Sequence, residues 1–243
     1  MTAEMPESKG VIAVTGASRG IGAAIALELA RRGFTVGCLT RQGSGPAHDR
    51  FIHLACDVTD VDSIRQALAT LAERSGSISG LVNNAGIHLD GKSSELSTEV
   101  YDEVMATNAR SVFVTCREAY PYLARAGGTI VNIGSFFDKL GVKRNLAYCA
   151  SKAAVGAITR CLAVEWAPKK IRVLDVAPGY IETELNAQAL QGPLRAFLEA
   201  RVPTGGPGGV QDVARLVALL FSEDIAYLTG ETIYIDGGQG MAH

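Results

Sequence analysis

Short runs of apolar residues alternate along the chain with longer segments of helical periodicity. The short runs are rich in Val, Ile and Leu, as strands buried on both faces of a sheet require. They predict strands over 11–14, 34–40, 51–56, 80–84, 128–134, 171–177 and 231–235. The longer segments predict helices over 23–30, 60–74, 96–107, 109–126 and 147–167. Strands and helices that alternate in this way indicate an α/β fold with a parallel, doubly wound sheet of seven strands and helices on both faces.

Three glycines, Gly16, Gly20 and Gly22, lie in the turn between the first strand and the first helix. Without a Cβ atom the backbone can turn sharply there and let a phosphate approach the N–H groups at the helix N-terminus. The spacing is Gly-x-x-x-Gly-x-Gly, which differs from the general dinucleotide fingerprint Gly-x-Gly-x-x-Gly. The strand before the turn and the helix after it favour a Rossmann pyrophosphate site over a merely flexible turn.

The end of the second predicted strand indicates which dinucleotide is preferred. An acidic residue about 20 positions after the glycine turn would accept the ribose hydroxyls of NAD. Here Thr40 and Arg41 occupy that place, and the first acid is Asp49. Arg19, inside the glycine turn, supplies a second cation. This pattern predicts NADP(H) in preference to NAD(H); the alternative is that both arginines are solvated surface residues.

A candidate catalytic group follows the fifth predicted strand. Ser135 ends that strand, and Tyr148 and Lys152 lie four residues apart on one face of the next helix. Free tyrosine has a pKa of about 10, and a neighbouring ammonium together with a cationic nicotinamide favours the phenolate. We expect Ser135 to hold a substrate carbonyl or hydroxyl, Tyr148 to transfer the proton, and Lys152 also to bind the nicotinamide ribose.

These motifs occur together, in order, with Asn83-Asn84-Ala85-Gly86, Asn108 and Pro178-Gly179. From residue 9 to residue 238 the chain resembles the short-chain dehydrogenase/reductase family. The resemblance implies a catalytic tetrad of Asn108, Ser135, Tyr148 and Lys152, in which Asn108 holds a proton-relaying water. It implies cofactor binding by Gly16, Ser18, Arg19, Gly20, Ile21, Gly22, Arg41, Asp57, Val58, Asn84, Ala85, Gly86, Tyr148, Lys152, Pro178, Gly179, Ile181 and Thr183.

Within that family the chain is most similar to the β-ketoacyl-(acyl carrier protein) reductases. The resemblance implies a carbonyl or alcohol substrate, with an acyl thioester on a carrier protein as one form of it. Residues 184–209 are implied to form a mobile lid over the substrate. A basic patch for an acidic carrier would include Arg125, Lys169 and Lys170. Phe136 and Phe137 are bulkier than the small residues common at that place.

Three other functions stay open at this point. One is a sugar, polyol or steroid dehydrogenase, or a xenobiotic reductase, of the same family. Another is a protein that senses NADP(H) without catalysis, although binding alone requires no proton donor at Tyr148. The last is a Rossmann-like methyltransferase, which would leave Tyr148 and Lys152 unexplained.

Composition and charge narrow the setting. The chain has 243 residues, of which 47% are hydrophobic, and this fits one α/β domain over 1–243 with a flexible tail at 1–8. Its formal charge of −2 disfavours nucleic-acid or membrane partners. The first residues lack the apolar core of a signal peptide, so we expect a cytoplasmic protein. The five cysteines form no Cys-x-x-Cys pair, so we expect them to be reduced thiols. The four histidines do not have the spacing of metal ligands, so we expect no metal site.

The helices predicted over 109–126 and 147–167 are apolar around most of their circumference. Such helices need cover on two sides, and the sheet provides one of them. We expect a second copy of the chain to provide the other, in a homodimer or homotetramer.

Overall fold

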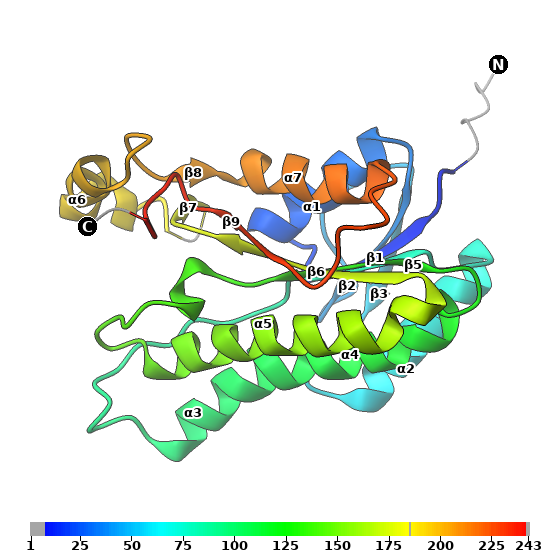
Figure 1. Cartoon of the computed structure of the whole chain (residues 1–243), viewed down its shortest axis with the longest axis horizontal. Coiled ribbons are helices and arrows are strands. Elements are labelled where there is room, and N and C mark those ends of the chain that lie inside the picture. Colours follow the sequence, from blue (N-terminus) through cyan, green and yellow to red (C-terminus); the bar gives the residue numbers. More distant parts are fainter. Residues whose placement is uncertain (1–7, 185, 242–243) are drawn as a thin grey trace.

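Seven parallel strands form the central sheet of the computed structural model, which describes residues 8–184 and 186–241 (Figure 1). The strand order is β3-β2-β1-β4-β5-β6-β9, so the order reverses on either side of β1. The strands are β1 (Val11–Thr15), β2 (Thr35–Thr40), β3 (Phe51–Ala55), β4 (Gly80–Asn83), β5 (Gly128–Ile133), β6 (Ile171–Pro178) and β9 (Thr232–Ile235). The predicted doubly wound sheet is confirmed, with strand ends within two residues of those expected from the apolar runs.

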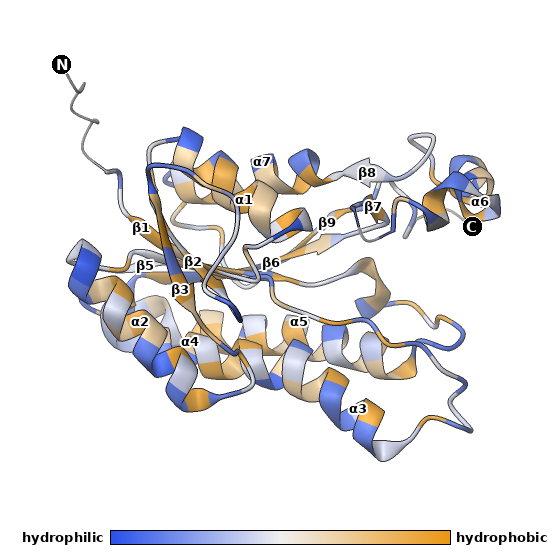
Figure 2. Cartoon of the chain, turned by 180° about the vertical axis from the view of Figure 1, so that it is seen from behind, coloured by the Kyte–Doolittle hydropathy of each residue, from blue (hydrophilic) through white to orange (hydrophobic). Residues whose placement is uncertain are grey.

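Helices cover both faces of this sheet (Figure 1). On one face lie α1 (Gly20–Arg31) and α7 (Val210–Ser222); on the other lie α2 (Val61–Ser75), α4 (Ser111–Leu123) and α5 (Leu146–Trp166). The buried hydrophobic residues accordingly form two main clusters, one on each face. Figure 2 shows the hydrophilic residues of α2 on its outer side. The sequence analysis did not predict α7, although Val213, Val217 and Leu220 give it a buried apolar face.

The chain does not break near Asn108, where an interruption between two helices was expected. Instead α3 (Thr98–Met105) continues into α4 through one π-helical turn, Ala106–Arg110. The wider turn keeps the backbone helical and buries the Asn108 side chain.

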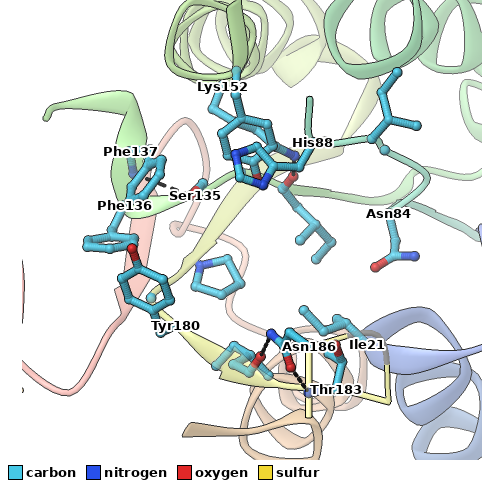
Figure 3. A pocket seen from close by; sticks show the side chains of 18 of the residues that line it. Ile21, Asn84, His88, Ser135, Phe136, Phe137, Lys152, Tyr180, Thr183 and Asn186 are labelled. Atoms are coloured by element: carbon cyan, nitrogen blue, oxygen red, sulfur yellow. Dashed lines mark hydrogen bonds between the residues drawn. The ribbon is translucent and has the colours of Figure 1, made fainter. Parts of the chain in front are cut away.

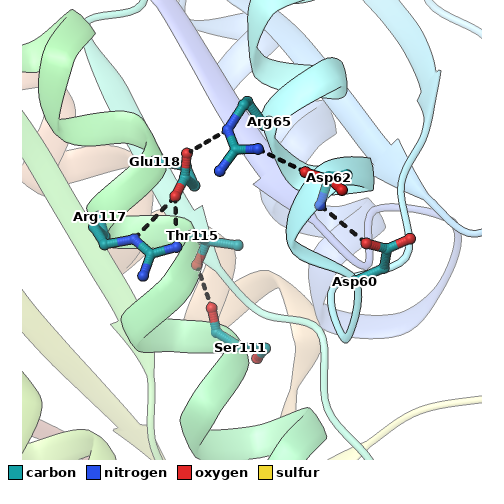
Figure 4. A network of polar contacts seen from close by, with 7 residues as sticks. All are labelled: Asp60, Asp62, Arg65, Ser111, Thr115, Arg117 and Glu118. Atoms are coloured by element: carbon teal, nitrogen blue, oxygen red, sulfur yellow. Dashed lines mark hydrogen bonds and ion pairs between the residues drawn. The ribbon is translucent and has the colours of Figure 1, made fainter.

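Charged residues join α2 to α4 on the surface (Figure 4). Arg65 donates to Glu118 at 3.1 Å and to Asp62 at 2.6 Å, and Arg117 donates to the other Glu118 oxygen at 2.7 Å. Glu118 is the least exposed of these side chains, at 14%. A shared carboxylate of this kind orients the two helices more than an isolated surface pair would.

Two short strands lie at the ends of the segment predicted to be a lid. β7 (Ile181–Glu182) pairs in parallel with β8 (Gly208–Gly209), and α6 (Pro193–Arg201) lies between them in sequence. Leu190, Leu198 and Val202 form a small hydrophobic cluster of their own. The segment therefore has a local core separate from the two clusters at the sheet.

The predicted tail at 1–8 falls largely outside the described residues, which begin at Ser8. Ser8 itself is fixed, because its hydroxyl oxygen accepts from the Thr35 backbone N–H at 3.1 Å. None of the helices in the described part of the chain is long and apolar enough to cross a membrane.

Candidate active site

Two cavities open at the carboxyl ends of the strands of the sheet. The first has a volume of about 440 Å³ and the second about 540 Å³. Five residues line both of them, so the two form one continuous cleft: Ile21, Asn84, Gly86, Ile87 and Thr183. This is the place where ligands bind in open α/β sheets.

The glycine turn forms one wall of the second cavity. Gly16 has φ +67°, and a Cβ atom on Gly22 would lie 2.3 Å from the Gly16 carbonyl oxygen, so helix α1 approaches the turn as closely as the backbone allows. The Asn84 amide nitrogen donates to the carbonyl oxygens of Thr15 and Gly16 at 3.1 and 3.2 Å. Asn84 therefore braces the turn in addition to lining the cleft.

The residues expected to bind the cofactor all line this cleft. The second cavity contains Gly16, Ser18, Arg19, Gly20, Ile21, Gly22, Arg41, Asp57, Val58, Asn84, Ala85, Gly86 and Thr183. The first cavity contains Tyr148, Lys152, Pro178, Gly179 and Ile181. A helix N-terminus, a turn without side chains and a long continuous cleft fit a dinucleotide whose pyrophosphate lies at α1.

Cations and an anion lie together at the far end of the second cavity. Arg19 and Arg41 form no ion pair with any residue that the structure describes. One Asp57 carboxylate oxygen accepts from the backbone N–H and the hydroxyl of Thr59 at 2.9 and 2.7 Å. These bonds, with Arg41 nearby, lower the pKa of Asp57. Its other oxygen forms no hydrogen bond to the described residues.

Ser135, Tyr148 and Lys152 all line the first cavity, as their positions in sequence predicted. Figure 3 shows Ser135 and Lys152 there. Ser135 is the second residue after β5, and its hydroxyl oxygen accepts from the Phe137 backbone N–H at 3.3 Å. Lys152, which is 6% exposed, donates from Nζ to the Ile133 carbonyl oxygen at 2.7 Å. The Lys152 Nζ lies 5.6 Å from the centre of the Tyr148 ring.

The surroundings that the protein itself provides shift the pKa of the Tyr148 phenol upward. Burial raises this pKa, while hydrogen bonding to Ser135 lowers it by less. Burial also lowers the pKa of Lys152 to about 8, although the charge of Asp175 opposes this shift. The ammonium of Lys152 points to a backbone carbonyl, so desolvation of the phenol outweighs the attraction that the Tyr-x-x-x-Lys spacing suggested.

Asn108 lies behind these residues, on the π-helical turn. Its side-chain oxygen accepts from the Ile87 N–H at 2.8 Å, and its amide donates to the Ile87 carbonyl at 2.8 Å and to the Ser151 hydroxyl at 3.1 Å. Both amide hydrogens are therefore engaged. Asn108 fixes the loop after β4 against α5, and a relay water would have to use a remaining oxygen lone pair.

An aromatic wall, which we define as Phe136, Phe137 and Tyr180, closes one side of the first cavity (Figure 3). Its rings lie with centroids 4.7 to 6.1 Å apart. His88, whose ring lies 4.7 Å from that of Tyr148, bonds to the Asn145 side chain. Both phenylalanines that the sequence analysis singled out as bulky therefore line the pocket.

Several lining residues were missed by the sequence analysis, namely Ile87, Asn145, Tyr180 and Asn186. Asn186 accepts from the Thr183 N–H at 2.7 Å and donates to the Ile181 carbonyl at 2.9 Å, so it holds the chain after β6 in place. Tyr180 directly follows Pro178-Gly179, and that adjacency was the available signal.

The three cations predicted to form a basic patch for a carrier protein lie away from the cleft of the same chain. The Gly128 N–H, at the start of β5, donates to the carbonyl of Lys170, directly before β6. Lys169, Lys170 and Arg125 therefore lie at the amino ends of the strands, across the sheet from Ser135. The spacing along α4 and α5 revealed cations at helix ends but not that these are the ends remote from the cleft.

Comparisons with known proteins extend over nearly the whole chain. The family model described as enoyl-(acyl carrier protein) reductase matches residues 16–239. The 3-oxoacyl-[acyl-carrier-protein] reductase FabG of Escherichia coli is 39% identical over 94% of this chain and 96% of that protein. The D-threitol dehydrogenase of Mycolicibacterium smegmatis is 34% identical over 94% and 92%. A putative short-chain alcohol dehydrogenase from Sinorhizobium meliloti has a TM-score of 0.92 at 33% identity, covering 97% and 98% of the two chains.

Proposed function

Because this chain belongs to the short-chain dehydrogenase/reductase family, we propose that it is an NADPH-dependent ketoreductase acting on 3-oxoacyl thioesters. The observation that carries the proposal is the single cleft in which Ser135, Tyr148 and Lys152 adjoin the glycine turn of α1. The similarity to FabG proteins supports the thioester substrate, either on a carrier protein or free.

The proposed chemistry assigns one role to each of these side chains. The nicotinamide cofactor, when bound, supplies a hydride to the carbonyl carbon. Ser135 donates a hydrogen bond to the carbonyl oxygen, and Tyr148 gives its phenolic proton to that same oxygen, so the product is a secondary alcohol. Lys152, as an ammonium, stabilises the phenolate that Tyr148 becomes until solvent returns a proton. Asn108 keeps the Ile87 loop in place beside them.

The preference for NADPH rests on the two unpaired cations at the second cavity. Arg41 lies where an acid would select NAD, and its guanidinium has no carboxylate partner in the described part of the chain. Replacing Arg41 by Ala should lower the NADPH-to-NADH ratio of kcat/KM about tenfold or more, as expected for one charge-assisted contact. Arg31→Ala, at an exposed arginine outside the cleft, is the matched control. An unchanged ratio in Arg41→Ala would remove the assignment.

A polyol dehydrogenase is the second candidate, since a D-threitol dehydrogenase is among the relatives. The aromatic wall favours the acyl substrate over a polyol. Phe136 and Phe137 are 3% and 8% exposed and offer no hydrogen bond, whereas each unpaired hydroxyl of a buried polyol would be unfavourable. Residues 184–209, closed by β7 and β8, would act as the lid over this wall.

Exposed apolar residues on α4 and α5, the two helices expected to pack against a second copy of the chain, support a homodimer or homotetramer. Phe113 on α4 and Leu146 and Val164 on α5 are 44%, 49% and 81% exposed. Apolar residues exposed along two neighbouring helices mark an association surface. A second copy of the chain seated on this face would bury them.

The test of the proposed function is the initial rate of cofactor oxidation with an acetoacetyl thioester, in parallel with NADPH and NADH. Fast turnover with NADPH supports the proposal. Oxidation of a four-carbon polyol with NADP⁺ or NAD⁺, without thioester turnover, would favour the second candidate. NADPH binding without turnover of either substrate class would instead point to a cofactor sensor.

A further inference from the structure

A buried carboxylate lies behind the candidate catalytic residues. Asp175, in the middle of β6, is 0% exposed. Its Oδ2 accepts from the Thr232 hydroxyl at 3.1 Å, while its Oδ1 has no hydrogen-bond partner among the described residues. A buried charge with an unpaired oxygen destabilises a fold, so its presence calls for a function.

Asp175 belongs to a row of polar side chains that crosses the sheet. The strand register places Asn83, Asn132, Asp175 and Thr232 side by side on β4, β5, β6 and β9. The two asparagines are well bonded: Asn83 donates to Asn132 at 2.9 Å, and Asn132 donates to Thr159 at 2.9 Å. Asp175 alone in this row is ionisable, and it is also the member left with a free oxygen.

Two glycines, one of which lines the first cavity, make room for this carboxylate. A Cβ atom on Gly134 would lie 2.4 Å from Asp175 Oδ1, and one on Gly156 would lie 4.0 Å from Oδ2. Gly134 directly precedes Ser135, and Gly156 follows Lys152 by one helical turn. The carboxylate is therefore packed against the backbone that carries both catalytic residues.

We propose that Asp175 is a positioning residue that keeps the buried Lys152 ammonium protonated, at a cost in the stability of the fold. This inference rests on the proposed function, because it concerns the lysine of that site. Lys152 is bonded to one neutral carbonyl and is enclosed by protein, so an opposite charge behind it compensates for the water that it has lost.

The electrostatics of the surroundings agree with this role. Burial lowers the pKa of Lys152 to about 8, and the charge of Asp175 opposes that shift. Burial raises the pKa of Asp175 to about 6, and this shift is opposed first by the Thr232 hydroxyl, then by the charge of Lys152 and by the Gly134 backbone N–H. Both groups are thus charged between about pH 6 and pH 8. The other ionisable neighbours are Tyr148 and Arg160 on α5, Asp138 after β5, which accepts from Tyr234 at 2.8 Å, and Lys139 over the Tyr234 ring.

The first arm of the test is the pH profile of ketone reduction by Asp175→Asn. We expect its alkaline limb to move down by about one pH unit, so that the ratio of rates at pH 8.5 and 6.5 falls up to about tenfold below that of the wild type. Asp138→Asn is the matched control, since it removes a neighbouring carboxylate that bonds to Tyr234 and leaves Asp175 in place. An unchanged profile in Asp175→Asn, or an equal shift in the control, would overturn the proposal.

The second arm needs no substrate. The pH dependence of Lys152 acetylation by trace acetic anhydride, followed by peptide mass spectrometry, reports the protonation of this lysine directly. The labelling midpoint should fall by about one unit in Asp175→Asn and stay unchanged in Asp138→Asn. If the wild type reduces no ketone, the proposed function fails while this arm still decides the role of Asp175. An identical midpoint in wild type and Asp175→Asn would refute that role.

Discussion

Replacing Asp175 by Asn should make the protein more stable at neutral pH, although it changes a fully buried polar side chain. The carboxylate has no exposed area, and its Oδ1 is unpaired. Asparagine has nearly the same shape and keeps an oxygen for the Thr232 hydroxyl. The substitution therefore tests the electrostatic burden of this residue with little change in packing.

The magnitude follows from the pKa of the carboxyl group. Burial raises the pKa of Asp175 from 3.8 to about 6, and a difference of about two units corresponds to roughly 3 kcal/mol. The pKa of Asp175 is higher in the folded than in the unfolded wild type. The wild type therefore has its full free energy of unfolding below about pH 4, where the carboxyl is protonated, and loses roughly this amount as the pH rises through about 6. The asparagine amide nitrogen would lack a partner where Oδ1 lies, which offsets about 1 kcal/mol or more. A net gain of about 1–2 kcal/mol is expected at pH 7.5.

Thermal unfolding of both proteins across pH measures this gain. For a chain of this length, about 1 kcal/mol changes Tm by roughly 2–4 °C, so Asp175→Asn should melt about 2–8 °C higher at pH 7.5. The advantage should shrink toward pH 4, where the wild-type carboxyl is protonated. A variant that melts lower than the wild type at pH 7.5, or a difference independent of pH, would show that the charge of Asp175 stabilises the fold or has no effect on it.

Three further substitutions test the site and the surface. Tyr148→Phe should lower ketone turnover at least about a hundredfold, the contribution of one proton donor, with NADPH affinity kept in a fluorescence titration; retained turnover would exclude the role. Gly22→Ala places a Cβ atom 2.3 Å from a backbone carbonyl oxygen and should lower the free energy of unfolding in denaturant by about 1–3 kcal/mol. The control Gly141→Ala, which has open space around it, should leave that free energy nearly unchanged. Equal effects of the two substitutions would contradict the close approach. Val164→Glu should dissociate the oligomer in light scattering while Leu219→Glu on α7 should not, and a wild-type monomer at micromolar concentration would refute the assembly.

The sheet could be predicted because its strands are short apolar runs separated by segments of helical periodicity. That pattern is local, and it located all seven strands. Elements without it were missed: β7 and β8 have two residues each and owe their existence to a pairing across the lid segment. The π-helical turn at Asn108 also has no local pattern, because it is fixed by hydrogen bonds from Asn108 to the distant Ile87 and Ser151.

The candidate site could be predicted as a set of residues, since each expected cofactor or catalytic side chain except Asn108 lines the cleft. Asn108 lies behind it, bonded to the Ile87 backbone. The sequence does not reveal the direction in which a side chain points or how far it is desolvated. The Tyr-x-x-x-Lys spacing puts two groups on one helical face but does not reveal that the ammonium of Lys152 turns to the Ile133 carbonyl. The basic residues at helix ends were likewise real, yet they lie across the sheet from the cleft.

Asp175 shows why such properties need the fold. In the sequence it is one acid within a buried apolar strand, and nothing along β6 indicates what faces it. Its surroundings come from other parts of the chain: Gly134 directly after β5, Gly156 and Lys152 on α5, and Thr232 on β9. The charge that these two glycines accommodate lowers the stability of the fold. Features that lower stability in this way are found mainly at functional sites. Because Gly134 directly precedes Ser135 and Gly156 lies one helical turn after Lys152, we place that function in the catalytic cleft.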